Sequence, residues 1–514
     1  MESRGNTAVD AALGELDEAQ RRAATTLEGP VRIVAGAGAG KTRTITHRIA
    51  HACAVGAWDP ARTLAVTFSR KAAAEMRSRL TALGVGQEVT AETFHSAALH
   101  QLWRVWDDVS DTEPPRVAED MGTTVERALR FATGSSDWDA AAVRAVQAEV
   151  NWTKVQLVAP QDYARVVAAT HREPPAGLDA GRFADVLVNY EREKSAYGRI
   201  DFNDILLVMC HVMEDFEDAA ARVRRSIGWL TVDEYQDVSP LQHRLLRLWL
   251  GHGDGGAGAG AGRPNANVCV VGDPAQTIYS FAGATSYYLT AFADEFAPIA
   301  ADIDLAVDYR STPQVVDYAN RVLAASPERG DYLRLRSARA SGTRITRTVY
   351  GSDQEEAAGV AARIARGVGK GMSPGDFAVL TRINAQGPAF VAALRREGLR
   401  CRVRRDAGWS GAALAPDQDA AKALEDRLGG QAPEGEVTIS TIHAAKGLEF
   451  RHVFLVGLSE GLLPYGSPAP GAALEEERRL LYVGVTRAED SLHLSYARTK
   501  DGSGAGRRIS RFLG

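Results

Sequence analysis

The chain has 514 residues, of which 45% are hydrophobic and 24% are charged, and its formal net charge is −5 at pH 7. This length predicts about three or four domains of roughly 100–200 residues each. No apolar run is long enough to span a bilayer, and the slightly acidic charge argues against a general basic surface for nucleic acid, so any DNA binding must be local, in a groove. The N-terminus has neither the basic nor the apolar segment of a secretion signal, so we expect a cytoplasmic location and no membrane partner.

Short apolar runs that are typical of buried parallel strands recur along the chain. Patterns with helical spacing lie between them, which predicts strand–helix–strand crossover units. The fold class that follows is α/β with two parallel sheets. The runs comprise residues 31–36, 63–68, 229–234 and 268–273 in the first half of the chain, and residues 377–382, 453–458 and 492–496 in the second half.

The pattern changes to helical spacing, without a clear strand-like run, over residues 97–200. We interpret this segment as a helical insertion in the first α/β unit. A second segment, rich in Ala, Gly, Pro and Asp, is predicted to be a linker. The predicted organisation is therefore a first α/β unit at 1–96 and 201–302, the insertion at 97–200, and a second α/β unit at 303–514 with its linker at about 410–433.

A glycine-rich segment, AGAGAGKT, follows the first strand-like run and precedes a helical pattern. This arrangement is typical of a phosphate loop, in which backbone N–H groups converge on the phosphates of a nucleotide. Lys41 can reach the β- and γ-oxygens, and the Thr42 hydroxyl can bind Mg²⁺. The alternative is a Gly/Ala-rich turn without a ligand, in a chain that is already rich in these residues. The residues concerned are Ala35, Gly36, Ala37, Gly38, Ala39, Gly40, Lys41 and Thr42, with alanine at position 35 where the strict pattern has glycine.

Two adjacent carboxylates end another strand-like run, in the segment VDEYQD at 232–237. A nucleotide-hydrolysing enzyme needs such groups opposite its phosphate loop. Asp233 is predicted to hold Mg²⁺, and Glu234 to orient and deprotonate the attacking water. A solvated acidic turn is the alternative, but such a turn gives no reason for its place at a strand end behind a phosphate loop.

Further motifs follow one another along the chain and carry a family resemblance. They are TFSRKAAAEMRSR at 67–79, TFHS at 93–96, VGDPAQTIYSFAGA at 271–284, DYRSTP at 308–313, TISTIHAAKGLEF at 438–450 and EEERRLLYVGVTRAED at 475–490. In this order, from about residue 16 to about residue 496, they resemble the motif set of the UvrD/Rep/PcrA superfamily-one helicases. The resemblance implies two RecA-like parallel-sheet domains with a nucleotide-phosphate loop and a helical insertion, called 1B, in the first.

For the base and sugar of ATP, the resemblance implies that Gln20 reads the adenine edge, with Arg43 near the base and Tyr309 stacked on it. Glu449 would lie near the ribose or the phosphates. A polar helix cap is the alternative for Gln20, and a core aromatic is the alternative for Tyr309.

For the γ-phosphate, the resemblance implies Gln276 as a sensor and Arg310 and Arg487 as arginine fingers supplied by the second unit. An arginine finger is worth roughly 10³–10⁵ in rate. The commoner fate of an arginine is a salt bridge, which is the alternative for both.

For single-stranded DNA, the resemblance implies a groove across both units, in which aromatic faces stack on bases and polar groups hold phosphates. Its predicted lining comprises Thr67, Phe68, His95, Tyr279, Phe281 and His443. Aromatics beside strands are more often core residues, which is the alternative for Phe68 and Phe281. The chain departs from many relatives in having Phe281-Ala282 where they have Trp-Arg, and Arg70 where they have Asn.

The resemblance also has a gap. Relatives carry a large second insertion, called 2B, between segments like 378–386 and 438–447, and this interval is too short here for a domain of about 100 residues. The implied function is an ATP-dependent 3′–5′ single-stranded DNA translocase or helicase in repair or replication maintenance, with a duplex junction as a further substrate. The sequence does not identify a protein partner. The alternatives are an ATP-switched protein that binds DNA or a partner without processive movement, and an RNA-directed motor.

Overall fold

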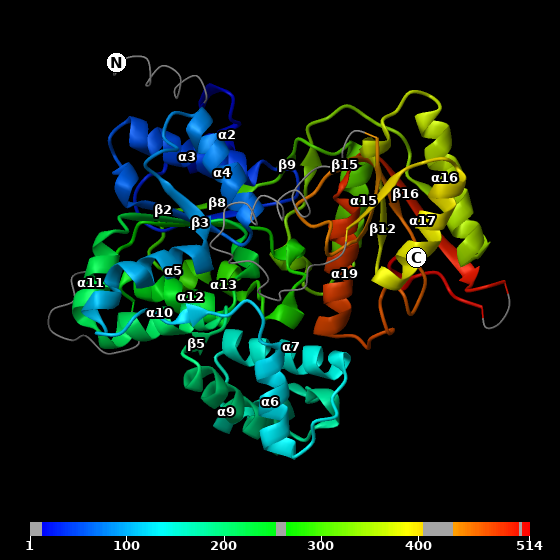
Figure 1. The fold of residues 1–514 in the computed structure, drawn as a ribbon. Coiled ribbons are helices and arrows are strands. Elements are labelled where there is room, and N and C mark those ends of the chain that lie inside the picture. The colour runs from blue at the N-terminus through cyan, green and yellow to red at the C-terminus, as the bar shows by residue number, and fades with distance from the viewer. Residues whose placement is uncertain (1–12, 253–263, 405–434, 503–505, 514) are drawn as a thin grey trace.

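The computed structural model describes residues 13–252, 264–404, 435–502 and 506–513. Two α/β domains lie side by side, and a helical lobe lies below them (Figure 1). The predicted linker at 410–433 falls outside the described residues. Among the residues that are described, none of the helices is long and apolar enough to cross a membrane.

The first α/β domain is built on a six-stranded sheet in which all neighbouring strands are parallel. The four apolar runs predicted in the first half of the chain form its interior. The edge strands at both sides were not predicted, because β8 alternates between buried and exposed residues and so lacks an apolar run. In spatial order the strands are β3 (Thr90–Thr93), β2 (Thr63–Thr67), β6 (Trp229–Val232), β7 (Val268–Gly272), β1 (Val31–Ala35) and β8 (Ala301–Leu305).

Helices cover both faces of this sheet. One face packs in a core around Ile33, Ile45 and Met76, and the other in a core where Trp249 stacks on Phe94. The helices are α2 (Glu18–Thr25), α3 (Lys41–Ala54), α4 (Arg70–Ala82), α5 (Phe94–Val105), α10 (Asp204–Asp215), α11 (Glu217–Arg225), α12 (Pro240–Leu250), α13 (Tyr287–Thr290) and α14 (Phe292–Glu295).

Two domain boundaries differ from those expected. Helix α5 packs in the core of the first domain through Ala98 and Leu102, so the insertion does not begin at residue 97. Strand β8 pairs with β1 as far as Leu305, so a boundary after residue 302 falls inside a strand. Both differences have one physical cause, since periodicity shows that a segment is helical or extended but does not show which core it joins.

The second α/β domain repeats this plan with another six-stranded parallel sheet. The three apolar runs predicted in the second half lie in β12, β15 and β16. In spatial order the strands are β11 (Thr346–Ser352), β16 (Ala488–Thr499), β15 (Phe450–Leu455), β12 (Phe377–Thr381), β14 (Val437–Thr441) and β13 (Cys401–Arg404), and the helices are α15 (Pro313–Ala324), α16 (Asp353–Val368), α17 (Gly387–Arg396) and α19 (Ala472–Val485). A small parallel pair is formed by β9 (Val307–Asp308) and β10 (Arg336–Ser337).

The helical lobe has a core of its own, built around Val125, Val146, Phe183 and Tyr190. Its chain enters and leaves through a short parallel pair of strands, so both crossings lie at one neck. The lobe comprises β4 (Arg116–Val117), α6 (Gly122–Thr133), α7 (Ala140–Val155), α8 (Tyr163–Thr170), α9 (Ala180–Ala196) and β5 (Arg199–Ile200). The predicted helical insertion is therefore present, within narrower bounds.

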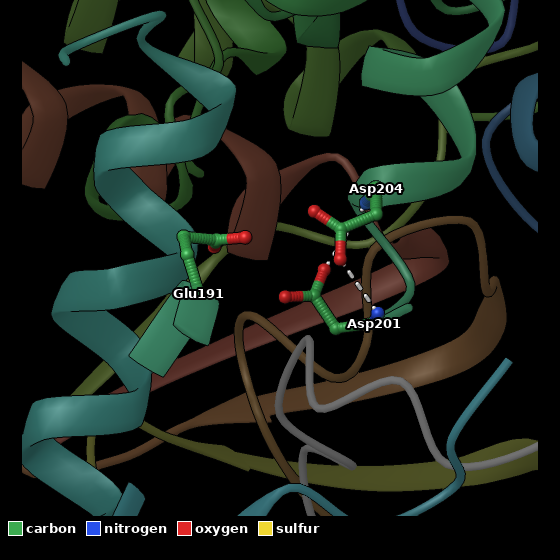
Figure 2. Close-up of side chains that lie close together, drawn as sticks. All are labelled: Glu191, Asp201 and Asp204. Carbon is green, nitrogen blue, oxygen red and sulfur yellow. Dashed lines mark hydrogen bonds between the residues drawn. The ribbon is translucent and has the colours of Figure 1, made fainter. Parts of the chain in front are cut away.

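Three carboxylates converge at this neck, on Glu191, Asp201 and Asp204 (Figure 2). Their spacing would suit a cation, but two ammonium groups already lie among them. Lys154 Nζ is 2.5 Å from Asp201 Oδ2 and 2.6 Å from Asp204 Oδ1, and Lys194 Nζ is 2.8 Å from Glu191 Oε2. The ion network, which comprises these five residues and is buried except at Glu191, therefore joins α7 and α9 of the lobe to the start of α10 in the first domain.

Replacing Lys154 by methionine is expected to destabilise the protein by about 3–5 kcal/mol, because it leaves two buried carboxylates short of a cation. Urea denaturation followed by circular dichroism measures the loss. The control is Arg165→Met, which removes an exposed ion pair with Asp162 and should cost less than about 1 kcal/mol. Equal midpoints for the two variants would show that the network adds nothing to stability.

Candidate nucleotide and nucleic-acid sites

The predicted phosphate loop lies between β1 and α3. Gly40 and Gly38 have positive φ values of 75° and 71°, which glycine adopts without steric cost. A Cβ at Gly38 would lie 2.1 Å from Asp308 Oδ1 of the second domain, so that close approach also requires glycine. Lys41 Nζ donates to the backbone oxygens of Ala35 and Gly36, at 3.1 and 3.4 Å. The loop is thus formed, and its lysine is bound to the loop's own carbonyls.

The carboxylates predicted at the end of β6 face this loop. Asp233 Oδ2 is 3.5 Å from the Thr42 hydroxyl, and both oxygens are of the kind that Mg²⁺ prefers. Burial and the neighbouring Glu234 raise the pKa of Asp233 to about 7. Burial also disfavours the Glu234 carboxylate, but the ammonium groups of Lys41 and Lys446 outweigh it and hold the Glu234 pKa below its ordinary value. The donor set fits a magnesium ion next to an ionised Glu234.

The residues expected at the adenine gather at the N-terminus of α2. Gln20 is buried, caps that helix together with Asp17, and donates from Nε2 to the Ala39 oxygen of the phosphate loop at 2.9 Å. The Tyr309 hydroxyl, from the second domain, donates to the Asp17 carboxylate, and its side chain is 45% exposed. Arg43 pairs with Glu15. Gln20 is therefore a helix cap and a contact of the phosphate loop at once, and Tyr309 is not a core aromatic.

An open cavity of about 470 Å³ lies between the phosphate loop and the second domain. Arg310 and Glu449 form an ion pair in its wall, with Arg310 Nη2 2.5 Å from Glu449 Oε2. The cavity therefore joins residues that the sequence assigned separately to phosphates, base and fingers. Its lining comprises Gly38, Gly40, Tyr309, Arg310, Arg339, Glu449, Arg451, Glu489 and Asp490.

Two of the residues expected at the γ-phosphate are held away from this cavity. Arg487 is buried and donates to the oxygens of Val483 and Leu448 and to the Thr486 hydroxyl. Burial, with Arg310 nearby, lowers the pKa of Arg487 to about 10. Gln276 is also buried and donates to Asp273 Oδ2 at 2.7 Å. The cavity thus receives one of the two predicted arginine fingers in this arrangement of the domains.

Lys446 is a functional candidate that the sequence reading missed, although its motif was recognised. Its Nζ is 2.5 Å from Asp237 Oδ2 and 2.7 Å from the Gln276 oxygen, both in the first domain, and it lies 5.0 Å from the centre of the Tyr279 ring. Burial raises the pKa of Asp237 to about 6. The lysine therefore bridges the two domains directly behind Glu234.

Three of the residues expected at DNA form one aromatic cluster across the domains, comprising Tyr279, Phe281 and His443. Their ring centres lie 5.9–6.2 Å apart, and the Tyr279 hydroxyl donates to the His443 oxygen at 3.0 Å. Phe281 is 59% exposed, so its face is free to stack on a base and it is not a core residue. The aromatic cluster contacts Lys446 and so adjoins the region behind the nucleotide site.

The other three residues expected at DNA lie inside the first domain. Thr67 and His95 are buried, and in the described part of the chain Thr67 Oγ1 and His95 Nε2 have no hydrogen-bond partner. His95 stacks on Phe202 at 3.8 Å, and Phe68 packs on Phe94. Among the ring contacts of the described residues, none joins these side chains to the aromatic cluster. The structure thus brings together half of the predicted DNA-binding set.

His95 is expected to make the protein less stable in acid. Burial lowers its folded pKa to about 3, so between that value and the unfolded value of about 6.5 only the unfolded state binds the proton. Stability therefore falls as the pH falls from 7 to 5, by about 2 kcal/mol from this residue. His95→Gln should remove that share, as measured by urea denaturation at both pH values. His211→Gln, at an exposed histidine, is the control for replacing histidine by glutamine, and the effect of His95→Gln is compared with it.

Comparisons with known proteins cover nearly the whole chain. Residues 16–297 match the family described as UvrD/REP helicase N-terminal domain, and residues 303–408 and 420–499 match the UvrD-like helicase C-terminal domain. The chain is 38% identical to the ATP-dependent DNA helicase UvrD2 of Mycobacterium tuberculosis, over 98% of this chain and 82% of the relative. It is 26% identical to the ATP-dependent DNA helicase PcrA of Leuconostoc citreum, over 97% and 84%.

The similarity to PcrA extends to Bacillus subtilis, at 24% identity over 95% of this chain and 83% of the relative. The aligned regions span 593 residues for the Mycobacterium protein and 660 for the Leuconostoc protein, more than the 514 residues of this chain. The relatives therefore carry inserted residues that this chain lacks, in keeping with the short interval between residues 386 and 438.

Proposed function

Since the chain belongs to the UvrD/Rep helicase family, we propose that it is an ATP-dependent DNA helicase that hydrolyses ATP between its two α/β domains and moves along single-stranded DNA from 3′ to 5′. The observation that carries the proposal is the shared cavity. Glycines of the phosphate loop from the first domain and Tyr309, Arg310 and Glu449 from the second line one space, so a nucleotide there contacts both domains. ATP binding would then close the cleft between the domains, and hydrolysis would open it.

In this mechanism each group has a stated task. The loop N–H groups and Lys41 bind the phosphates, for which Lys41 leaves its own loop carbonyls. Thr42 and Asp233 would hold Mg²⁺, which neutralises charge on the phosphate oxygens when bound. Glu234 orients the attacking water and takes its proton on a carboxylate oxygen, as its lowered pKa allows. Arg310 supplies positive charge from the second domain, and Arg487 joins it once ATP occupies the cavity.

The nucleic-acid track includes the aromatic cluster. Stacking of a base on an aromatic face is worth roughly 1–3 kcal/mol and is tolerant of sequence, as a motor requires. Lys446 contacts both the ring of Tyr279 and Asp237 beside Glu234. This lysine therefore couples movement of the DNA strand to ATP hydrolysis. Thr67 and His95 join the track only when the domains rearrange. The proposed setting is DNA repair or replication maintenance in the cytoplasm, with duplex junctions as a further substrate.

The test is steady-state ATP hydrolysis by the purified chain with single-stranded DNA of increasing length. A translocating motor gives stimulation that grows with length towards a plateau, and strand displacement on substrates with a 3′ or a 5′ tail then decides unwinding and direction. The same assay with RNA strands of matched length and sequence shows whether DNA or RNA stimulates ATP hydrolysis. Stimulation by RNA alone, or no stimulation by either, would overturn the proposal.

A second candidate is an ATP-switched DNA-binding protein without processive movement. The specific observation in its favour is the shortened interval where relatives carry an insertion, together with Phe281-Ala282 in the aromatic cluster region. This candidate predicts tight DNA binding that depends on ATP, with no growth of ATP turnover with strand length. The same assay therefore separates the two.

A further inference from the structure

A continuous chain of hydrogen bonds runs from Glu234 to the second domain. Gln236 Nε2 donates to Glu234 Oε2 at 2.5 Å, and Gln236 Oε1 accepts the backbone N–H of Asp273 at 3.0 Å. Asp273 Oδ2 accepts the Tyr482 hydroxyl of helix α19 at 3.3 Å. The residues that link Glu234 to α19 are buried, so no water competes for these bonds.

Tyr482 is also fixed against the phosphate loop. Ala37 of that loop packs together with Tyr482 in the apolar core of the second domain. Tyr482 thus contacts both the loop that binds phosphates and the carboxylate that holds Gln276. Withdrawal of α19 would break both contacts together.

The middle of the chain has little freedom to rearrange. A Cβ at Gly272 would lie 2.4 Å from Gln236 Oε1, so the Gln236 amide packs directly on the β7 backbone. Asp273 Oδ1 is occupied by the backbone N–H of Ala275, which leaves Oδ2 for Gln276 and Tyr482. Because these groups are tightly packed, a displacement at one end of the hydrogen-bond chain shifts the group at the other end.

We propose that Tyr482 is a positioning residue that reports closure of the second domain to Glu234 through Asp273 and Gln236. The proposal rests on ATP hydrolysis as the function of the cleft. In the closed cleft the hydroxyl holds Asp273, Asp273 holds Gln276 and Gln236, and Gln236 holds the Glu234 carboxylate towards the attacking water. When the cleft opens the Asp273 carboxylate loses a donor and Glu234 is less well aligned, so hydrolysis is confined to the closed state.

The experiment is Tyr482→Phe, which removes the hydroxyl and keeps the ring in the core. We expect kcat for ATP hydrolysis with single-stranded DNA to fall about tenfold, because a buried bond to a charged group is lost. The KM for ATP and the apparent Kd for the strand should stay within about twofold, since Tyr482 orients a group and does not bind substrate. The control is Tyr318→Phe, another buried tyrosine of the same domain, whose hydroxyl is bonded within that domain by Arg347; it should keep the wild-type kcat.

A double-mutant cycle with Gln236→Met tests the path. If the two residues act through one chain, the double variant is no slower than the slower single variant. The proposal would be overturned if the two substitutions lowered kcat multiplicatively in the double variant. It would also be overturned if Tyr482→Phe raised KM at unchanged kcat or kept wild-type turnover. Should Tyr482→Phe melt well below its control, Gln236→Met alone decides, and wild-type kcat in that variant would refute the path. An inactive wild-type chain would instead refute the proposed function.

Discussion

Replacing Arg310 by alanine is expected to lower kcat for ATP hydrolysis by roughly 10³–10⁵, the share of an arginine finger. Arg310 enters the cavity from the second domain and pairs there with Glu449, so its guanidinium is available to a phosphate once that pair exchanges partners. Lysine at this position should restore little, because its single ammonium cannot reproduce the planar fork of donors. Steady-state hydrolysis with saturating single-stranded DNA measures the effect.

The matched control for Arg310 is Arg511→Ala. Arg511 forms a similar ion pair with Glu460 in the same domain, and neither residue lines the cavity, so its loss tests the general cost of removing such a pair. That variant should keep the wild-type kcat. If Arg310→Ala lowers kcat less than about tenfold, Arg310 is a salt-bridge residue and not a finger.

Replacing Glu234 by glutamine is expected to lower kcat by roughly 10²–10⁴ while ATP binding is retained. The amide has the same shape but does not accept the proton of the attacking water. Glu234 also adopts a left-handed backbone conformation with φ of 54°, which few residues other than glycine adopt and which is often found at active sites. Hydrolysis assays give kcat, and calorimetric titration with ATP gives the affinity.

The control for Glu234 is Glu356→Gln. Glu356 is a buried carboxylate of the second domain that accepts from the Gly457 N–H and the Ser495 hydroxyl, so its loss tests the cost of neutralising a buried acid. Wild-type hydrolysis in that variant and a collapse in Glu234→Gln assign the proton transfer to Glu234. Comparable kcat values for Glu234→Gln and the wild type would remove Glu234 from the reaction.

The candidate nucleotide site was predictable where local chemistry alone decides it. The phosphate loop needs glycines at positive φ and a lysine at the start of a helix, and both stand next to each other in the sequence. The carboxylates of Asp233 and Glu234 were also predictable, because they directly follow a buried strand in the sequence. By contrast, Tyr482 and Lys446 acquire their contacts from residues more than 150 positions away, and no local pattern records such a distance.

The candidate nucleic-acid residues divide in the same way. The sequence placed Tyr279, Phe281 and His443 in one groove through family resemblance, and the structure joins them across the domains. Thr67 and His95 lie in motifs that resemble the family as closely, but their side chains are buried here. Side-chain exposure depends on how the domains and the helical lobe pack, which a motif does not encode.

The sequence by itself determined the α/β class, every interior strand except β14 and the chemistry of the phosphate loop, because burial on both faces and the demands of a phosphate each select residue types locally. It missed the edge strands β8 and β11, which are half exposed and lack an apolar run. Only the tertiary structure decided that α5 belongs to the first domain, that Arg487 binds backbone oxygens and that Tyr482 links the domains. Those outcomes depend on which distant segments pack together, and packing is a property of the whole chain.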